Sequence, residues 1–205
     1  MSTTGDVTAV AYHFDPLCPW TWRTSRWLID VTGRLGLPLS YRAFELSDGA
    51  PLDAVPDQHR AGAMASRSFL RVVEAAHARE DDEVIAAFYT AYGTAVHDGK
   101  ARPSRELIEA TLTEAGGRDY LAALDDASLD TDVAASRRAA QVFSGDDAGS
   151  PVIVLSTGDG QRGFFGPVLA PIPTGADADR LWQVVTGFAT LAQVFEIKRR
   201  RDAIP

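Results

Sequence analysis

The order of strand-like and helix-like segments is the feature that most restricts how this chain can fold. Apolar and β-branched patterns typical of strands occur only toward the two ends, at residues 7–14, 38–45, 152–156 and 162–165. Between them, residues 57–143 repeat apolar side chains at helical spacing, as in the series Ile85, Phe88, Tyr89, Tyr92 and Val96. Two more helices are predicted, over residues 19–35 and 176–201. The chain therefore reads β-α-β, then a helical block, then β-β-α.

Without the helical block, the order β-α-β-β-α remains, which is the order of the thioredoxin fold. We therefore expect an α/β protein. Its thioredoxin-like domain would be built from residues 1–50 and 148–205, and an α-helical domain would be inserted at residues 57–143. The last helix is expected to bury a face formed by Leu181, Val184, Val185, Phe188, Leu191 and Phe195. Its final turn would carry the basic run Lys198–Arg201, which suits the negative end of the helix dipole.

The charge balance limits the partners of the chain. Asp and Glu number 28 against 20 Lys and Arg, so the formal net charge is −8. This balance argues against a general affinity for nucleic acids or anionic membranes, which bind clustered positive charge. No stretch approaches the roughly 20 apolar residues that span a bilayer, and the N-terminal residues lack the pattern of a secretory signal. We therefore expect a cytoplasmic protein without nucleic-acid or membrane partners.

Cys18 is the only cysteine, so neither an internal disulfide nor a thiolate zinc site can form within one chain. It stands directly before Pro19, a residue type favoured at the first position of a helix, and would therefore occupy the N-cap. There the free backbone N–H groups and the helix dipole favour a thiolate over a thiol. Thr21, about one turn further on, could donate a hydrogen bond to that thiolate. A lone cysteine is more often an inert buried residue, but this position favours a reactive one.

No tightly bound cofactor and no metal are indicated. The glycines of TGDGQRG, residues 157–163, lie between two short strands rather than before a helix. They therefore predict a hairpin turn and not a phosphate-binding loop. His, Cys and carboxylate residues do not recur at the spacing of a metal-ligand set.

The stretch FDPLCPWTW, Phe14–Trp22, resembles the active-site segment of DsbA-like thioredoxin-fold proteins. It is most similar to the actinobacterial subfamily that includes the mycothiol-dependent nitroreductase, in which the motif reads F-D-P-x-C-P-W-C-W. Further matches follow in order along the chain: SRW at Ser25–Trp27, GSPVI at Gly149–Ile153, FFGPVL at Phe164–Leu169, IP at Ile172–Pro173 and FE-x-KR at Phe195–Arg199. The resemblance thus covers nearly the whole chain.

The resemblance implies roles for particular residues. Cys18 matches the nucleophile, and Pro151 matches a cis-proline that stands beside it and offers backbone for substrate pairing. The implied substrate- or thiol-binding residues are Pro19, Trp20, His97, Ser150, Pro151 and Phe165. Three of these have an alternative structural interpretation: Trp20 could be a packing aromatic, His97 could be a helix-end partner of the dipole, and Phe165 could serve only strand packing.

Thr21 stands where the family has its second, resolving cysteine, which gives the motif CPWT. The chain therefore cannot form an internal disulfide, and a mixed disulfide on Cys18 needs a thiol from outside. The resemblance favours a monothiol oxidoreductase that works with a low-molecular-weight thiol such as mycothiol. Its partners would be small thiols or disulfides, or protein mixed disulfides; a homodimer stays open. The alternatives are a thiol-cofactor enzyme like kappa-class glutathione transferase or 2-hydroxychromene-2-carboxylate isomerase, and a binding protein without catalysis.

Overall fold

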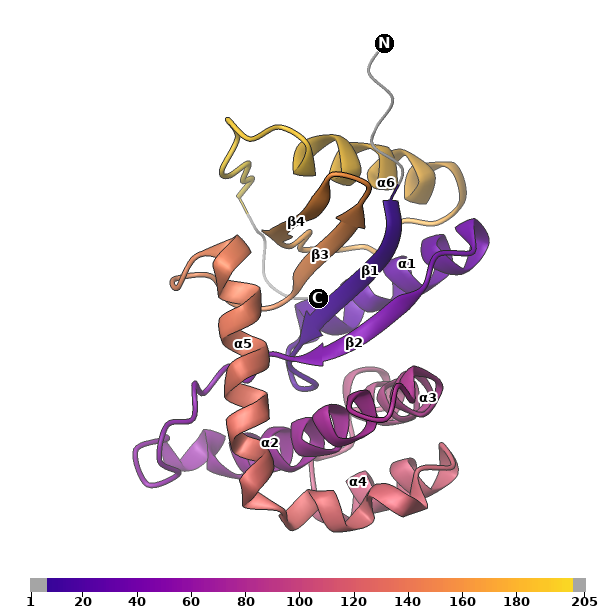
Figure 1. Cartoon of the computed structure of the whole chain (residues 1–205). Coiled ribbons are helices and arrows are strands. Elements are labelled where there is room, and N and C mark those ends of the chain that lie inside the picture. Colours follow the sequence, from indigo (N-terminus) through magenta and orange to yellow (C-terminus); the bar gives the residue numbers. More distant parts are fainter. Residues whose placement is uncertain (1–6, 201–205) are drawn as a thin grey trace.

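The computed structural model describes residues 7–200, which form a four-stranded sheet covered by helices (Figure 1). The strand order is β2-β1-β3-β4. β1 pairs with β2 in parallel, whereas β3 runs antiparallel to both β1 and β4. This arrangement confirms the predicted α/β fold of the thioredoxin type. The strands span Val7–Phe14 (β1), Leu39–Ala43 (β2), Val152–Thr157 (β3) and Gly160–Phe165 (β4).

Helices cover both faces of the sheet. α1 (Pro19–Leu35) and α6 (Gly175–Ala189) lie together, and the Trp27 indole N–H donates to the Ala178 carbonyl at 3.1 Å. α5 (Asp130–Ser144) packs on the other face, where Ala140 meets Val152 and Val154 of β3. Ile153 and Leu155, the alternate residues of β3, belong to the main core instead. The alternation is that of a strand buried on both sides.

The segment between β2 and β3 is helical. It consists of α2 (Asp57–His77), α3 (Asp82–Gly93), α4 (Arg105–Glu114) and α5, joined by a π-helical turn at Thr94–Asp98 and by 3₁₀ segments at Arg118–Asp125 and Ala127–Leu129. Figure 1 shows α2, α3 and α4 grouped beside the β2 edge of the sheet. Their contacts position the candidate site, because α3 and the π-helical turn reach α1.

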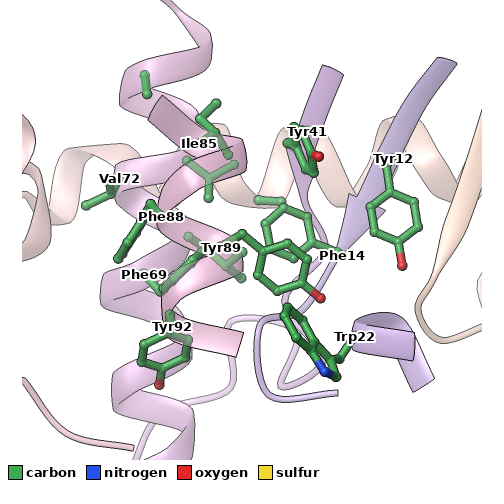
Figure 2. Close-up of a cluster of buried hydrophobic side chains, with 14 of the residues drawn as sticks. Tyr12, Phe14, Trp22, Tyr41, Phe69, Val72, Ile85, Phe88, Tyr89 and Tyr92 are labelled. Atoms are coloured by element: carbon green, nitrogen blue, oxygen red, sulfur yellow. The ribbon is translucent and has the colours of Figure 1, made fainter. Parts of the chain in front are cut away.

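One aromatic cluster joins these helices to the sheet (Figure 2). The rings of Phe69 and Phe88 stack with their centroids 4.0 Å apart, and Phe14 of β1 lies 4.2 Å from Tyr89 of α3. The main core is therefore continuous from β1 through α2 and α3. That residues 57–143 form a separate inserted domain stays a proposal. In the structure, their apolar residues belong to the same core as those of the sheet.

The last helix is shorter than predicted. α6 ends at Ala189, so the basic residues Lys198–Arg200 do not lie in a helical turn, and Arg201 lies outside the described residues. The expected buried face is wrong at Val184, Leu191 and Phe195, which are 59%, 52% and 92% exposed. The apolar spacing continues beyond Ala189, but Leu191 and Phe195 are largely exposed rather than packed in the core. Without tertiary packing, such spacing alone does not hold a helix together.

Candidate functional site

Cys18 lies where β1 gives way to α1, as predicted. β1 ends at Phe14, and a short turn closes when the Cys18 N–H donates to the Asp15 carbonyl at 3.2 Å. Pro19 then begins α1, and Cys18 is its N-cap residue with extended backbone angles. The Cys18 side chain makes no capping hydrogen bond and is 7% exposed. Its sulfur therefore stands at the positive end of a 17-residue helix.

A buried carboxylate, which the sequence reasoning missed, fixes this turn. Asp15 is 3% exposed and accepts hydrogen bonds from the N–H groups of Leu17 and Leu46 at 2.9 and 3.0 Å. It also accepts one from the Ser66 hydroxyl of α2 at 2.9 Å. Burial raises the pKa of Asp15 above its ordinary value, while these donors oppose the rise. Asp15 thus ties the active-site turn, the segment after β2 and α2 together.

The segment before β3, distant in sequence, meets the start of α1 at Cys18 and Thr21. Cys18 Sγ faces the Ser150 carbonyl oxygen at 3.8 Å, and the Ser150–Pro151 peptide bond is cis. The hydroxyls of Thr21 and Ser150 are 2.9 Å apart and hydrogen bonded, although 129 positions separate them. Thr21 and Ser150 are 0% and 5% exposed, so this hydroxyl pair is shielded from water.

The hydrogen bond of Thr21 differs from the expectation. We expected its hydroxyl to donate to Cys18, but in the structure it pairs with the Ser150 hydroxyl instead. Oxygen is the stronger acceptor, since a thiol sulfur accepts only weakly. A pair of hydroxyls uses one hydrogen between its two oxygens, so the second hydrogen is left for another acceptor.

A cavity of about 320 Å³ opens beside the start of α1. Pro19 and His97, both among the predicted site residues, line it. Trp22 and Ile172, which also line it, belong to the matched motifs Phe14–Trp22 and Ile172–Pro173. The other lining residues were not singled out from the sequence and are Arg23, Asp98 and Pro171. The cavity thus lies between α1, the π-helical turn and the segment after β4.

Trp22 forms the wall between this cavity and the core, and three neighbours hold its indole. The His97 ring stacks on it with centroids 5.7 Å apart, and the guanidinium of Arg26 lies 3.9 Å from the ring centre. The indole N–H donates to Asp98 Oδ1 at 3.1 Å. In Figure 2 the Trp22 indole lies below the Tyr89 ring.

His97 contacts the active-site turn directly. Its Nε2 donates to the Pro16 carbonyl at 2.9 Å, two residues before Cys18. Burial lowers the pKa of His97 below its ordinary value, although that hydrogen bond and the charge of Asp98 oppose the shift. These contacts explain the position of His97 without the alternative interpretation, in which His97 is a partner of the helix dipole.

Four predicted binding residues do not line this cavity: Ser150 and Pro151, which lie at Cys18, and Trp20 and Phe165. Trp20 is half-buried at the second position of α1 and is not among the lining residues. Phe165 is 41% exposed at the end of β4, while its neighbour Phe164 packs edge-on against Phe188 of α6. Phe165 pairs in register with Val152, the residue after Pro151, and is not among the residues that line the cavity.

Within residues 7–200, no group of three or more His, Cys, Asp or Glu side chains could hold a metal ion. No helix in the same range is long and apolar enough to cross a membrane.

Comparisons with known proteins agree with this geometry. The family described as mycothiol-dependent nitroreductase Rv2466c matches residues 17–199. The uncharacterized protein Rv2286c of Mycobacterium tuberculosis is 33% identical over 199 residues, which is 96% of this chain and 84% of that protein. The cytosolic disulfide reductase DsbM from Pseudomonas aeruginosa has a TM-score of 0.57 at 19% identity, over 86% of this chain and 98% of that one. For the disulfide oxidoreductase DsbA from Proteus mirabilis, the TM-score is 0.53 at 15% identity, over 89% and 86% of the two chains.

Proposed function

The chain belongs to the family of the mycothiol-dependent nitroreductase Rv2466c, and we propose that it is a monothiol thiol–disulfide oxidoreductase. Cys18 would be the nucleophile, and a low-molecular-weight thiol such as mycothiol would be the co-substrate. The observation that carries this proposal is the position of Cys18 Sγ, at the start of α1 and 3.8 Å from the Ser150 carbonyl. A helix start favours the thiolate, which is the attacking form in disulfide exchange.

The reaction would proceed in two exchanges. The Cys18 thiolate attacks one sulfur of a disulfide, the S–S bond breaks, and the other sulfur leaves as a thiolate. Cys18 is then held in a mixed disulfide. Because Thr21 replaces a resolving cysteine, a second small thiol attacks the bound sulfur and releases Cys18 as a thiolate. In each exchange one disulfide is broken and one is formed, so the electrons balance without another cofactor.

Thr21 and Ser150 would support the thiolate as a pair. Their mutual hydrogen bond consumes one hydroxyl hydrogen, whichever oxygen donates. The Ser150 carbonyl beside the sulfur cannot donate, so a thiolate at Cys18 needs another donor. We assign that donor to the remaining hydroxyl hydrogen of the pair. Ser150 and Pro151 would also present backbone to the substrate.

A second candidate is a thiol-cofactor enzyme, such as a nitroreductase, transferase or isomerase. The observation that favours it is the cavity lined by Pro19, Trp22 and Ile172, which suits a planar organic molecule. In this alternative the cavity would take the organic substrate and Cys18 would act on a bound thiol. A binding protein without catalysis is the third reading. The cytoplasmic location and a homodimer stay predictions.

The test is the mass of the intact protein after treatment with mycothiol disulfide. We expect one mycothiol to be added at Cys18 and to be removed again by reduced mycothiol. Cys18→Ser should take up none, and Thr21→Ala should react about tenfold more slowly, because it loses one charge-assisted hydrogen bond. Uptake by Cys18→Ser, or none by the native protein, would contradict the proposal. If the native protein takes up no mycothiol but reduces a nitroaromatic in its presence, the thiol-cofactor enzyme is favoured.

A further inference from the structure

The ring nitrogens of His97 have different partners. A carbonyl oxygen only accepts hydrogen bonds, so Nε2, which lies 2.9 Å from the Pro16 carbonyl, carries the hydrogen. In a neutral imidazole the lone pair is then on Nδ1. Nδ1 has no hydrogen-bond partner among the described residues, and the His97 side chain lines the cavity beside Pro19. The His97 ring, with a lone pair on Nδ1, therefore forms part of the wall of a cavity that Pro19, the residue after Cys18, also lines.

The ring is held in a fixed orientation. Its Nε2 is attached to the active-site turn, and its face is stacked on Trp22. Trp22 in turn is held by the hydrogen bond to Asp98 and by the guanidinium of Arg26 over its ring. A base needs this restraint, since proton transfer requires hydrogen-bond reach in a defined geometry.

The charged groups around His97 leave it neutral near pH 7. Asp98 on the same turn favours protonation, while burial opposes it and lowers the pKa overall. Two arginines of α1 are nearby: the Arg26 guanidinium lies over the Trp22 ring, and Arg23 lines the same cavity. Both are cations and add no stabilisation to an imidazolium. The neutral ring is the form that accepts a proton.

We propose that His97 is the general base that takes the proton of the small thiol when that thiol releases Cys18 from its mixed disulfide. This inference rests on the proposed function and adds to it the group that activates the co-substrate. The incoming thiol transfers its proton to Nδ1, and its sulfur attacks the sulfur bound to Cys18. The S–S bond to Cys18 breaks, and the electron pair leaves on Sγ. The products are a small-molecule disulfide, a Cys18 thiolate and an imidazolium.

The experiment follows the release step alone. Cys18 is first converted to its mixed disulfide with mycothiol disulfide, excess reagent is removed, and reduced mycothiol is added from about pH 6 to about pH 10. The mass of the acid-quenched protein gives the rate of release. His97→Gln is the test variant, because its amide N–H can still donate to the Pro16 carbonyl. His59→Gln, at an exposed position of α2, is the matched control.

We expect His97→Gln to slow release at least about tenfold at pH 7, as for loss of a general base. The difference in release rate between the native protein and His97→Gln should vanish near pH 10, where the small thiol ionises without a base. Alkylation of free Cys18 by iodoacetamide should be unchanged, since the base acts on the incoming thiol.

Three results would overturn the proposal. One is an equal slowing at every pH, which would indicate a structural role for His97. Another is an altered alkylation rate of Cys18, which would place the effect on the nucleophile. The third is a native protein that forms no mixed disulfide at all; only this result also removes the proposed function.

Discussion

Trp22 shows how a single side chain couples the inserted helices to the site. It lies four residues after Cys18 on α1, yet its partners His97 and Asp98 come from the π-helical turn. The indole also packs against Gly93, the last residue of α3, where a side chain has no room. A Cβ at Gly93 would lie 2.2 Å from Trp22 Cζ3. Trp22 can therefore occupy its position only because residue 93 is a glycine.

Gly93→Ala should therefore displace the indole and weaken both the core and the site. We expect a loss of about 1–3 kcal/mol in the free energy of unfolding, typical of overpacking, measured by urea denaturation. Release of a Cys18 mixed disulfide by mycothiol should slow as well. The control is Gly187→Ala in α6, where nothing lies within 4 Å of the added Cβ. That change should stabilise by about 0.5–1 kcal/mol, because alanine favours a helix. Equal effects of the two changes would contradict the prediction.

At the scale of elements, carboxylates of α2 and α3 accept hydrogen bonds from the β2 edge of the sheet. The Ala43 N–H donates to Glu74 of α2 at 2.8 Å, and the Tyr41 N–H donates to Asp82 of α3 at 3.1 Å. Glu74 is 5% exposed and also pairs with Arg42 at 3.0 Å. An open strand edge offers unpaired N–H groups to other chains, so these contacts close one route to edge pairing.

Glu74→Leu should destabilise the protein by about 1–3 kcal/mol, because it leaves the buried Ala43 N–H without a partner. Glu74→Gln should cost less, since its amide oxygen can still accept that hydrogen bond. Urea denaturation of both variants tests this order. Glu109→Leu, at an exposed position on α4 where Glu109 pairs with Arg105, should change stability by no more than about 0.5 kcal/mol. If Glu74→Leu lowers the free energy of unfolding no more than Glu109→Leu does, the hydrogen bond from the Ala43 N–H to Glu74 does not contribute to stability.

The elements also show what the sequence could predict. α1 was predicted with its observed bounds, because Pro19 suits a helix start and Gly36 has the positive φ of 66° that suits its end. α6 was overextended, because no local signal marks where packing stops. Cys18 was found from its neighbours in sequence, but the Thr21–Ser150 pair spans 129 positions and needed the fold. Trp22 was recognised as part of the Phe14–Trp22 motif, but its contact with Asp98 spans 76 positions and needed the fold.

At the scale of the whole molecule, His13 links the sheet to the helix that crosses it. It lies on β1, is 4% exposed, and has Nδ1 3.4 Å from the Ser136 hydroxyl of α5. Ser136 itself donates to the Ala43 carbonyl of β2 at 2.8 Å. Burial, and then the charge of Arg42, lower the pKa of His13 to about 4. The folded protein thus holds a neutral histidine between its layers.

The stability of the protein should consequently fall as the pH drops from about 6.5 to about 4. In this range the unfolded chain binds a proton at His13 and the folded protein does not, so protonation favours unfolding. The full loss is about 3 kcal/mol, and it is absent above pH 6.5. Asp15 acts in the opposite sense, since its raised pKa favours the folded state at acid pH. The difference between the native protein and His13→Gln isolates the histidine.

We expect the free energy of unfolding of His13→Gln, measured by urea denaturation at several pH values, to be lower than that of the native protein at pH 7. The gap should narrow toward pH 4, because only the native chain loses stability by protonation of this residue. His59→Gln, at an exposed site, should follow the native curve throughout. Parallel curves for His13→Gln and the native protein would mean that His13 takes up its proton in the folded state, with the layers able to admit the charge.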